Sequence, residues 1–145
     1  MAKEARYSEG KYDTFTQTYS HDHRQWGNDL YYCDVDGVEW MPVGSKWYPV
    51  AIVEECHASR VNDRSFQLAR YCELADALSS YYGYRVHAFF VKWTCNLGQP
   101  EGERIETVDV TCLATGARRQ WTRERWVQQL RTLRDRVRKH LSGMR

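Results

Sequence analysis

Acidic side chains stand in two predicted strands whose ends can meet. Asp34 and Asp36 lie in the first strand, and Glu54 follows 18 positions after Asp36, where a nearly continuous apolar run ends. Two or three carboxylates at adjacent strand ends are the oxygen ligands that a hard divalent cation such as Mg²⁺ prefers. A cation held there lowers the pKa of a bound water and neutralises charge that develops on a phosphate. The pattern therefore indicates phosphoryl-transfer chemistry, with Mg²⁺ or Mn²⁺ as the cofactor.

A hairpin must position these acids. Residues 30–40 favour a strand because aromatic and β-branched side chains are frequent there, and alternation places Asp34 and Asp36 on one face. Residues 42–46 have turn chemistry, and residues 48–57 begin as an apolar run typical of a buried strand. We therefore expect a two-stranded ribbon with the acidic residues at its open end.

A helix and further strands follow the hairpin. Residues 60–82 carry apolar side chains at approximately helical spacing, and residues 84–94 favour a strand. A helix that crosses between two strands of one sheet makes them parallel. After a loop at 96–104, residues 105–113 alternate like another strand, and a last helix covers about 122–142. These elements predict an α/β fold with a mixed central sheet of about four or five strands flanked by helices.

Length and composition limit the classes of protein. The 145 residues are expected to form a single domain over 1–145, and 42% apolar with 28% charged residues excludes disordered, collagen-like and coiled-coil chains. Apolar runs are too short to cross a bilayer and the N-terminus lacks a signal peptide, so we expect a cytoplasmic protein without membrane contact. Five cysteines without a CxxC pair argue against a disulfide framework and a zinc ribbon.

Positive charge is concentrated at the C-terminal end. Residues 123–145 hold 8 Lys or Arg against 2 Asp or Glu, whereas residues 1–122 hold 13 against 17. The basic side chains fall mainly opposite the apolar stripe of the last predicted helix. Two interpretations stay open: a surface that contacts the phosphates of a polyanion such as DNA, or an ordinary solvated helix face.

Several segments, in this order, resemble the core of the PD-(D/E)xK nuclease superfamily. They are Asp34-Val35-Asp36-Gly37-Val38-Glu39, Pro49-Val50-Ala51-Ile52-Val53-Glu54-Glu55-Cys56, a helix opened by Phe66-Gln67-Leu68, and the strand at 86–93. The resemblance covers about residues 30–94 and rests on order and pattern. It implies a restriction-endonuclease-like core, in which a mixed sheet is flanked by helices.

The same resemblance implies roles for individual residues. Asp36 and Glu54 match the two metal-binding acids, with Asp34 as a supplement, and Gln67 resembles the glutamine that some branches carry beside the metal. The motif asks for a lysine two positions after the glutamate, where this chain has Cys56. A thiol brings no positive charge to the scissile phosphate, so this departure bears directly on catalysis.

Two alternatives address the missing lysine. Lys92, on the next predicted strand, can supply the charge from a neighbouring element. A register shifted by one residue instead makes Glu55 and His57 the pair, with Glu55 binding the metal. His57 is then a neutral donor or a general base with a suitable pKa near 7. Cys56 itself is interpreted as a buried thiol rather than a reactive one.

The function that the resemblance implies is a metal-dependent endonuclease that hydrolyses phosphodiester bonds of DNA. A nuclease of this size usually needs a second subunit to cut both strands, so a homodimer is expected. The alternative is a nuclease-fold module that has lost turnover and binds nucleic acid or a protein partner, which Cys56 supports. A third hypothesis, a small phage or mobile-element protein that binds a host factor, rests on compactness alone.

Two other polar features are interpreted as structural. His21-Asp22-His23 has the composition of half a metal site, but no third ligand is evident nearby, so a polar turn is expected. Glu39 is expected on the surface. Neither feature enters the predicted site.

Overall fold

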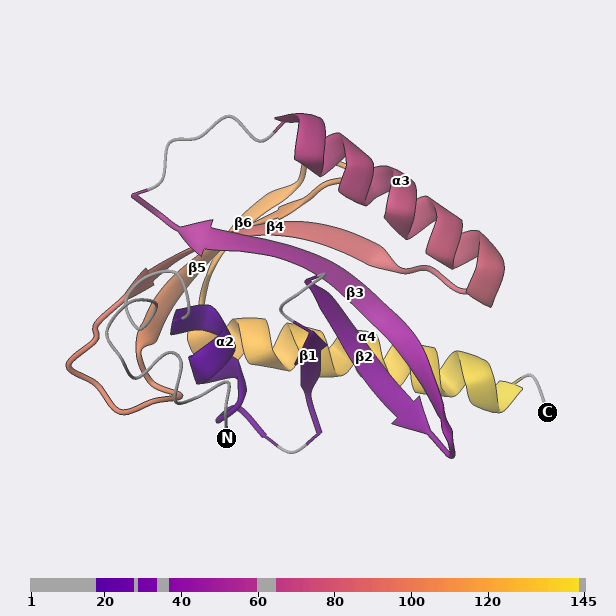
Figure 1. Cartoon of the computed structure of the whole chain (residues 1–145), viewed down its shortest axis with the longest axis horizontal. Coiled ribbons are helices and arrows are strands. Elements are labelled where there is room, and N and C mark those ends of the chain that lie inside the picture. Colours follow the sequence, from indigo (N-terminus) through magenta and orange to yellow (C-terminus); the bar gives the residue numbers. More distant parts are fainter. Residues whose placement is uncertain (1–17, 28, 34–36, 60–64, 144–145) are drawn as a thin grey trace.

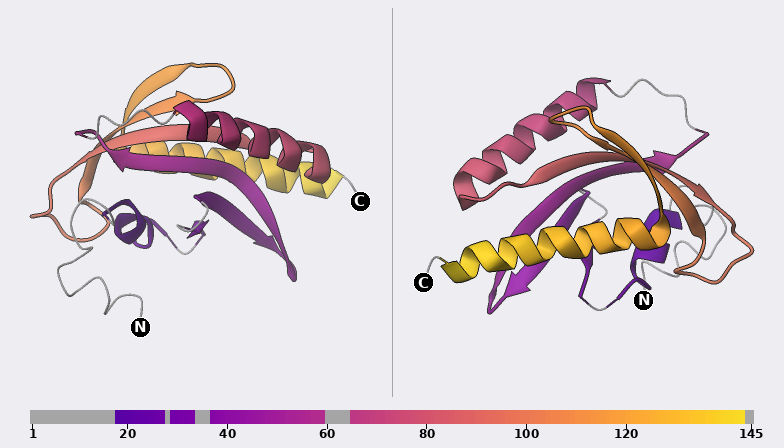
Figure 2. Two further views of the ribbon diagram at one scale, coloured as in Figure 1. Left: turned by 45° about the horizontal axis from the view of Figure 1, so that its top comes forward. Right: turned by 180° about the vertical axis from the view of Figure 1, so that it is seen from behind.

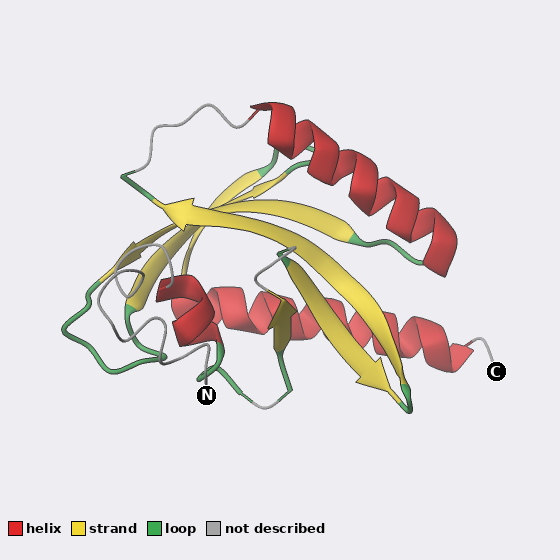
Figure 3. Ribbon diagram, in the orientation of Figure 1, coloured by secondary structure: helices red, strands yellow, loops and turns green. Residues whose placement is uncertain are grey.

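The computed structural model describes residues 18–27, 29–33, 37–59 and 65–143. Within these ranges a six-stranded sheet forms the centre of the molecule, and two long helices flank it (Figures 1 and 3). In chain order the elements are α2 (Thr18–His23), β1 (Tyr31–Cys33), β2 (Val38–Val43), β3 (Lys46–His57), α3 (Ser65–Tyr82), β4 (His87–Cys95), β5 (Ile105–Cys112), β6 (Arg118–Thr122) and α4 (Arg123–Gly143).

The sheet is mixed, and its strands lie side by side in chain order, β1-β2-β3-β4-β5-β6. β3 and β4 pair in parallel, and every other described pair is antiparallel. Because α3 carries the chain from the end of β3 back to the start of β4, the predicted parallel crossover is confirmed. The predicted α/β class with a mixed central sheet is confirmed as well.

The two long helices cover opposite faces of the sheet (Figures 1 and 2). On the α3 side a small cluster joins Ile52 of β3 to Ala75 of α3. On the other side, called the α4 side below, a larger core joins Val53 of β3 to Trp126 and Leu130 of α4. Successive residues of a strand point to opposite faces, so β3 serves both cores at once.

The hairpin begins differently from the prediction. Residues 30–40 do not form one strand, because β1 ends at Cys33, β2 begins at Val38, and these two residues pair with each other. Gly37 has a φ of 62°, a left-handed conformation that glycine adopts without steric cost. This conformation at Gly37 directly precedes β2. The next turn, at Gly44, lies where it was expected.

The C-terminal helix confirms its sequence pattern. The backbone N–H of Arg125 donates to Thr122 Oγ1 at 3.2 Å, so Thr122 caps the N-terminus of this helix. The apolar stripe of α4 is buried through Trp126, Val127, Leu130, Leu133 and Val137. Among the described helices, including α4 and the 18-residue α3, none is long and apolar enough to cross a bilayer.

The segment His21-Asp22-His23 is not a polar turn but the end of α2, and its polar groups are buried. Asp22 is fully buried and accepts backbone hydrogen bonds from Gly102 at 2.7 Å and Ile105 at 2.6 Å. His23 shares a 2.6 Å hydrogen bond with Glu39, which is 3% exposed rather than on the surface. These buried bonds attach α2 to the loop before β5 and to β2.

We expect Asp22→Asn to lower the free energy of unfolding by about 2 kcal/mol, because one of two buried backbone N–H groups would lose its acceptor and face an amide NH₂. Urea denaturation followed by circular dichroism measures the change. Asp135→Asn is the matched control, since that side chain is 68% exposed. A loss for Asp22→Asn no larger than that of the control would contradict the role assigned to the buried carboxylate.

Candidate active site

The two alternative glutamates lie on opposite faces of the sheet. Ile52 packs on the α3 side and Val53 on the α4 side. Alternation then places Glu54 and Cys56 on the α3 side and Glu55 on the α4 side. The two alternatives for the motif glutamate, Glu54 and Glu55, therefore belong to two different surfaces of the protein.

Lys92 lies beside the motif position. In the parallel pairing of β3 with β4, Cys56 is the register partner of Lys92, and Glu54 is the partner of Phe90. Residues in register on paired strands point to the same face, so Lys92 shares the α3 side with Cys56 and Glu54. The Lys92 ammonium lies 5.9 Å from the centre of the Phe90 ring. The structure thus brings together Glu54, Cys56 and Lys92 near the carboxyl ends of the two parallel strands.

Two further charged residues extend this group across the sheet. Asp109 on β5 is the register partner of Lys92, and Arg118 on β6 binds the Asp109 carboxylate through Nε at 2.8 and 3.0 Å and through Nη2. Hydrogen bonding to Arg118 lowers the pKa of Asp109 despite partial burial, and the charges of Arg118 and Lys92 lower it further. We call Glu54, Cys56, Lys92, Asp109 and Arg118 the open-face cluster.

Sequence analysis did not identify Asp109 or Arg118. The only signal for Asp109 was its polar character between the apolar neighbours Val108 and Val110. Arg118 belongs to β6, a strand that is mostly exposed and polar and was not predicted. Their relation to Lys92 depends on the register of β4, β5 and β6, which the sequence does not reveal.

Gln67 lies in the first turn of α3 and is exposed. Helix α3 packs against β3 and β4, the strands that carry Glu54 and Lys92. No hydrogen bond links the Gln67 amide to either of these two residues in the described structure. Its predicted place beside a metal stays a prediction.

Glu55 and His57 interact with Trp93 on the α4 side. The buried indole of Trp93 donates to Glu55 Oε2 at 2.5 Å, and the His57 ring packs edge-on against it at 5.1 Å between centroids. His57 Nδ1 accepts a hydrogen bond from the backbone N–H of Ser59 and lies 2.7 Å from its hydroxyl. These contacts give the Glu55 and His57 pair a packing role and separate it from Lys92.

The predicted metal ligands Asp34 and Asp36 lie outside the described residues. The described residues on either side are Cys33 and Gly37, and the Gly37 carbonyl accepts a 2.6 Å hydrogen bond from the backbone N–H of Val53. Among residues whose placement is given, no group of three or more His, Cys, Asp or Glu side chains could hold a metal ion. A metal centre at Glu54 therefore depends on the acids of the segment 34–36.

We expect Arg118→Gln to raise the pKa of Asp109 toward the ordinary aspartate value, because the largest stabilisation of its charged form is removed. Lys92→Met should raise the pKa by a smaller amount, since only a neighbouring charge is lost and no hydrogen bond is broken. NMR titration of the Asp109 carboxyl carbon measures both shifts. The stability that this pair contributes is present above the pKa of unfolded aspartate, and it is lost as pH falls through the lowered folded value.

Lys139→Gln, on the exposed side of α4, is the control and should leave the Asp109 titration unchanged. A Lys92→Met shift as small as that of the control would contradict the placement of the Lys92 ammonium beside Asp109.

Comparison with known proteins adds no family to this geometry, because no family model, curated protein or solved structure matches the chain. The function is therefore inferred from the residues that the fold brings together.

Proposed function

We propose that this protein is a metal-dependent endonuclease that hydrolyses DNA phosphodiester bonds, with Lys92 in place of the motif lysine. One observation carries the proposal: Cys56 and Lys92 are register partners on neighbouring parallel strands, on the same face as Glu54. A lysine at this position reaches the space beside the motif glutamate from the adjacent strand. The missing charge at Cys56 is thereby replaced by a neighbour that the fold fixes in place.

The donor chemistry of Glu54 fits a hard cation. Its carboxylate is only partly buried, at the carboxyl end of β3. In the proposal Glu54 and Asp36, with help from Asp34, hold Mg²⁺ or Mn²⁺, which when bound makes water nucleophilic and offsets phosphate charge. Lys92 contributes a fixed positive charge toward a non-bridging phosphate oxygen. The Lys92 charge also opposes the repulsion between Glu54 and an incoming phosphate.

The basic C-terminal helix contributes fewer phosphate contacts than its composition indicates. Three of its arginines hold protein groups: Arg123 donates to the Ile105 carbonyl at 3.0 Å, Arg131 binds Asp29 and the Trp26 carbonyl, and Arg134 lies 3.5 Å from Asp29. The exposed cations of α4 are Arg125, Arg136, Arg138 and Lys139. The proposed DNA contacts on this helix are restricted to these four.

A second candidate function keeps DNA binding without turnover. The Cys56 side chain is buried at 6% exposure and carries no charge in its thiol form, so the motif position itself supplies no catalytic group. In this form the protein binds nucleic acid or a protein partner through the same surfaces. For both candidates we propose a cytoplasmic protein, and for the nuclease a homodimer whose two sites cut the two strands.

A plasmid-nicking assay with Mg²⁺ or Mn²⁺ tests the proposal. We expect the wild type to nick supercoiled DNA, and Glu54→Gln or Lys92→Met to slow cleavage by about 100-fold or more. Glu55→Gln is the matched control: it keeps an oxygen acceptor for the Trp93 indole on the opposite face, so its rate should stay within about threefold of wild type. Adding Cys56→Lys to Lys92→Met should restore part of the activity, because it returns a lysine to the motif position.

The outcomes separate the candidates. Salt-sensitive DNA binding without cleavage would support the binding module and overturn the proposed hydrolysis. Loss of cleavage in Glu55→Gln but not in Glu54→Gln would move the site to the α4 side. A Lys92→Met variant as active as the wild type would refute the replacement of the motif lysine.

A further inference from the structure

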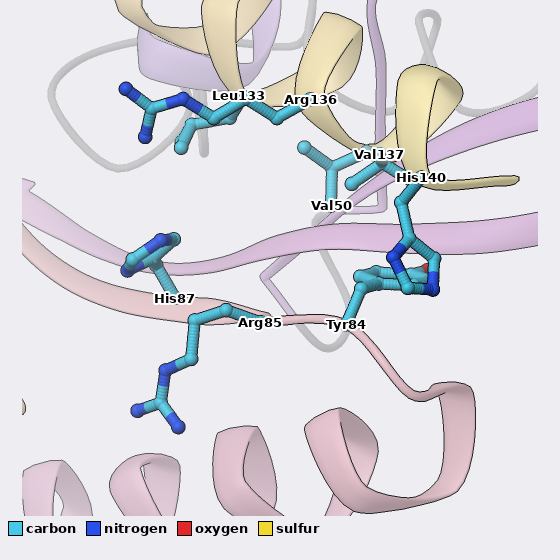
Figure 4. Close-up of a pocket in the computed structure, with 8 residues that line it drawn as sticks. All are labelled: Val50, Tyr84, Arg85, His87, Leu133, Arg136, Val137 and His140. Atoms are coloured by element: carbon cyan, nitrogen blue, oxygen red, sulfur yellow. The ribbon is translucent and has the colours of Figure 1, made fainter. Parts of the chain in front are cut away.

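A separate pocket lies on the α4 side, between helix α4, Val50 of β3 and the segment 84–87 at the start of β4 (Figure 4). Its volume is about 300 Å³. The lining residues are Val50, Tyr84, Arg85, His87, Leu133, Arg136, Val137 and His140. The pocket is distinct from the open-face cluster, because it lies on the opposite face of the sheet and at the amino end of β4.

One end of the pocket is cationic. His87 of β4 and Arg136 of α4 line opposite walls there (Figure 4). Burial lowers the pKa of His87, and the charges of Arg85 and Arg136 lower it further. Arg85 is compensated by a 3.0 Å ion pair with Asp76 and points toward α3, away from Arg136. Arg136 has no ion pair with any described residue, and the described lining contains no Asp or Glu.

The rest of the pocket is apolar and aromatic. Val50, Leu133 and Val137 are each at most 4% exposed and form the middle of the walls. At the far end the Tyr84 and His140 rings lie 5.5 Å apart at 60°. The Tyr84 hydroxyl is already used, since it donates to the Pro49 carbonyl at 2.7 Å.

A bulge in β3 explains why Val50 reaches this pocket. Pro49 pairs with Trp40 and Ala51 pairs with Glu39, so Val50 has no partner in β2. An extra residue in one strand breaks strict alternation and redirects a side chain. Val50 thus joins the α4-side core, although Ile52, two positions on, packs on the α3 side.

His140 contributes its ring to the pocket. Its Nε2 atom has no hydrogen-bond partner among the described residues, but it has almost no solvent-accessible surface. A ligand in the pocket therefore contacts other atoms of the His140 ring.

We propose that this pocket binds a nucleoside monophosphate, with the phosphate between Arg136 and His87 and the base beside Tyr84 and His140. A guanidinium and an imidazole are both suited to a phosphate, and an apolar pocket with a few polar groups is typical of small-ligand sites of this volume. A base has an aromatic surface that can pack against the Tyr84 and His140 rings at the other end of the pocket. Arg136 is also one of the proposed DNA contacts, but none of the lining residues belongs to the open-face cluster, so AMP binding is tested separately from DNA cleavage.

Titration of the full chain with AMP, followed by NMR of the histidine rings, tests this assignment. We expect saturable binding, with shifts at His87 and His140 and a rise in the pKa of His87, since a bound dianion favours the imidazolium. Adenosine and inorganic phosphate should each bind at least about tenfold more weakly, because each lacks one half of the ligand. Arg136→Gln should weaken AMP binding about tenfold or more.

Arg138→Gln is the matched control on the same helix, since Arg138 is exposed, lies near Asp135 and does not line the pocket. Its affinity for AMP should equal that of the wild type. Absence of AMP binding at about 10 mM would overturn the proposal. Equal affinity for inorganic phosphate and AMP, or equal losses in Arg136→Gln and Arg138→Gln, would also overturn it, because binding would then reflect the phosphate or the net charge alone.

Discussion

The parallel pairing of β3 with β4 is the constraint on which both proposed sites depend. It sets Cys56 against Lys92 near one end of the strands and Ala51 against His87 near the other. Burial holds this register, because Phe89, Val91 and Trp93 on β4 are at most 7% exposed and face α4. A slip of one residue would turn these side chains out of the core, so Lys92 is held on the α3 side by the packing of its neighbours.

Polar bonds attach α2 and the segment after it to β2, β5 and α4. Asp22 joins α2 to the loop before β5, and the pair of His23 with Glu39 joins it to β2. In the segment that follows α2, the Asp29 carboxylate and the Trp26 carbonyl bind Arg131 of α4. An arginine that binds a carboxylate or carbonyl of the protein itself is not available to bind a phosphate. The distribution of charge along the sequence therefore overstates the basic surface of the folded protein.

Periodicity was enough to predict the crossover helix, the parallel strands and the capped C-terminal helix, because each leaves a local pattern of apolar residues. The break between β1 and β2 was missed although Asp36-Gly37 is a local turn signal, since apolar alternation continues across it. β6 was missed because its five residues are mostly exposed and carry little apolar pattern. For the site, the sequence supplied Glu54 and Lys92 as candidates. That Glu54 and Lys92 share a face depends on the pairing of β3 with β4, which joins residues distant in the chain. The burial of Glu39 likewise depends on its contact with His23, 16 positions earlier.

The charges of the two surfaces differ in what they can attract. Within the open-face cluster Glu54 and Asp109 oppose Lys92 and Arg118, so the described charges balance, and a cation beside Glu54 requires the additional acids at 34 and 36. In the pocket, Asp76 offsets Arg85, whereas nothing described offsets Arg136. Arg136 is exposed, and its guanidinium can form paired hydrogen bonds with a phosphate at the edge of the apolar walls. The pocket thus has an unbalanced positive charge that an anionic ligand would neutralise. The open-face cluster has an excess of negative charge, and so attracts a cation, only if Asp34 and Asp36 contribute to it.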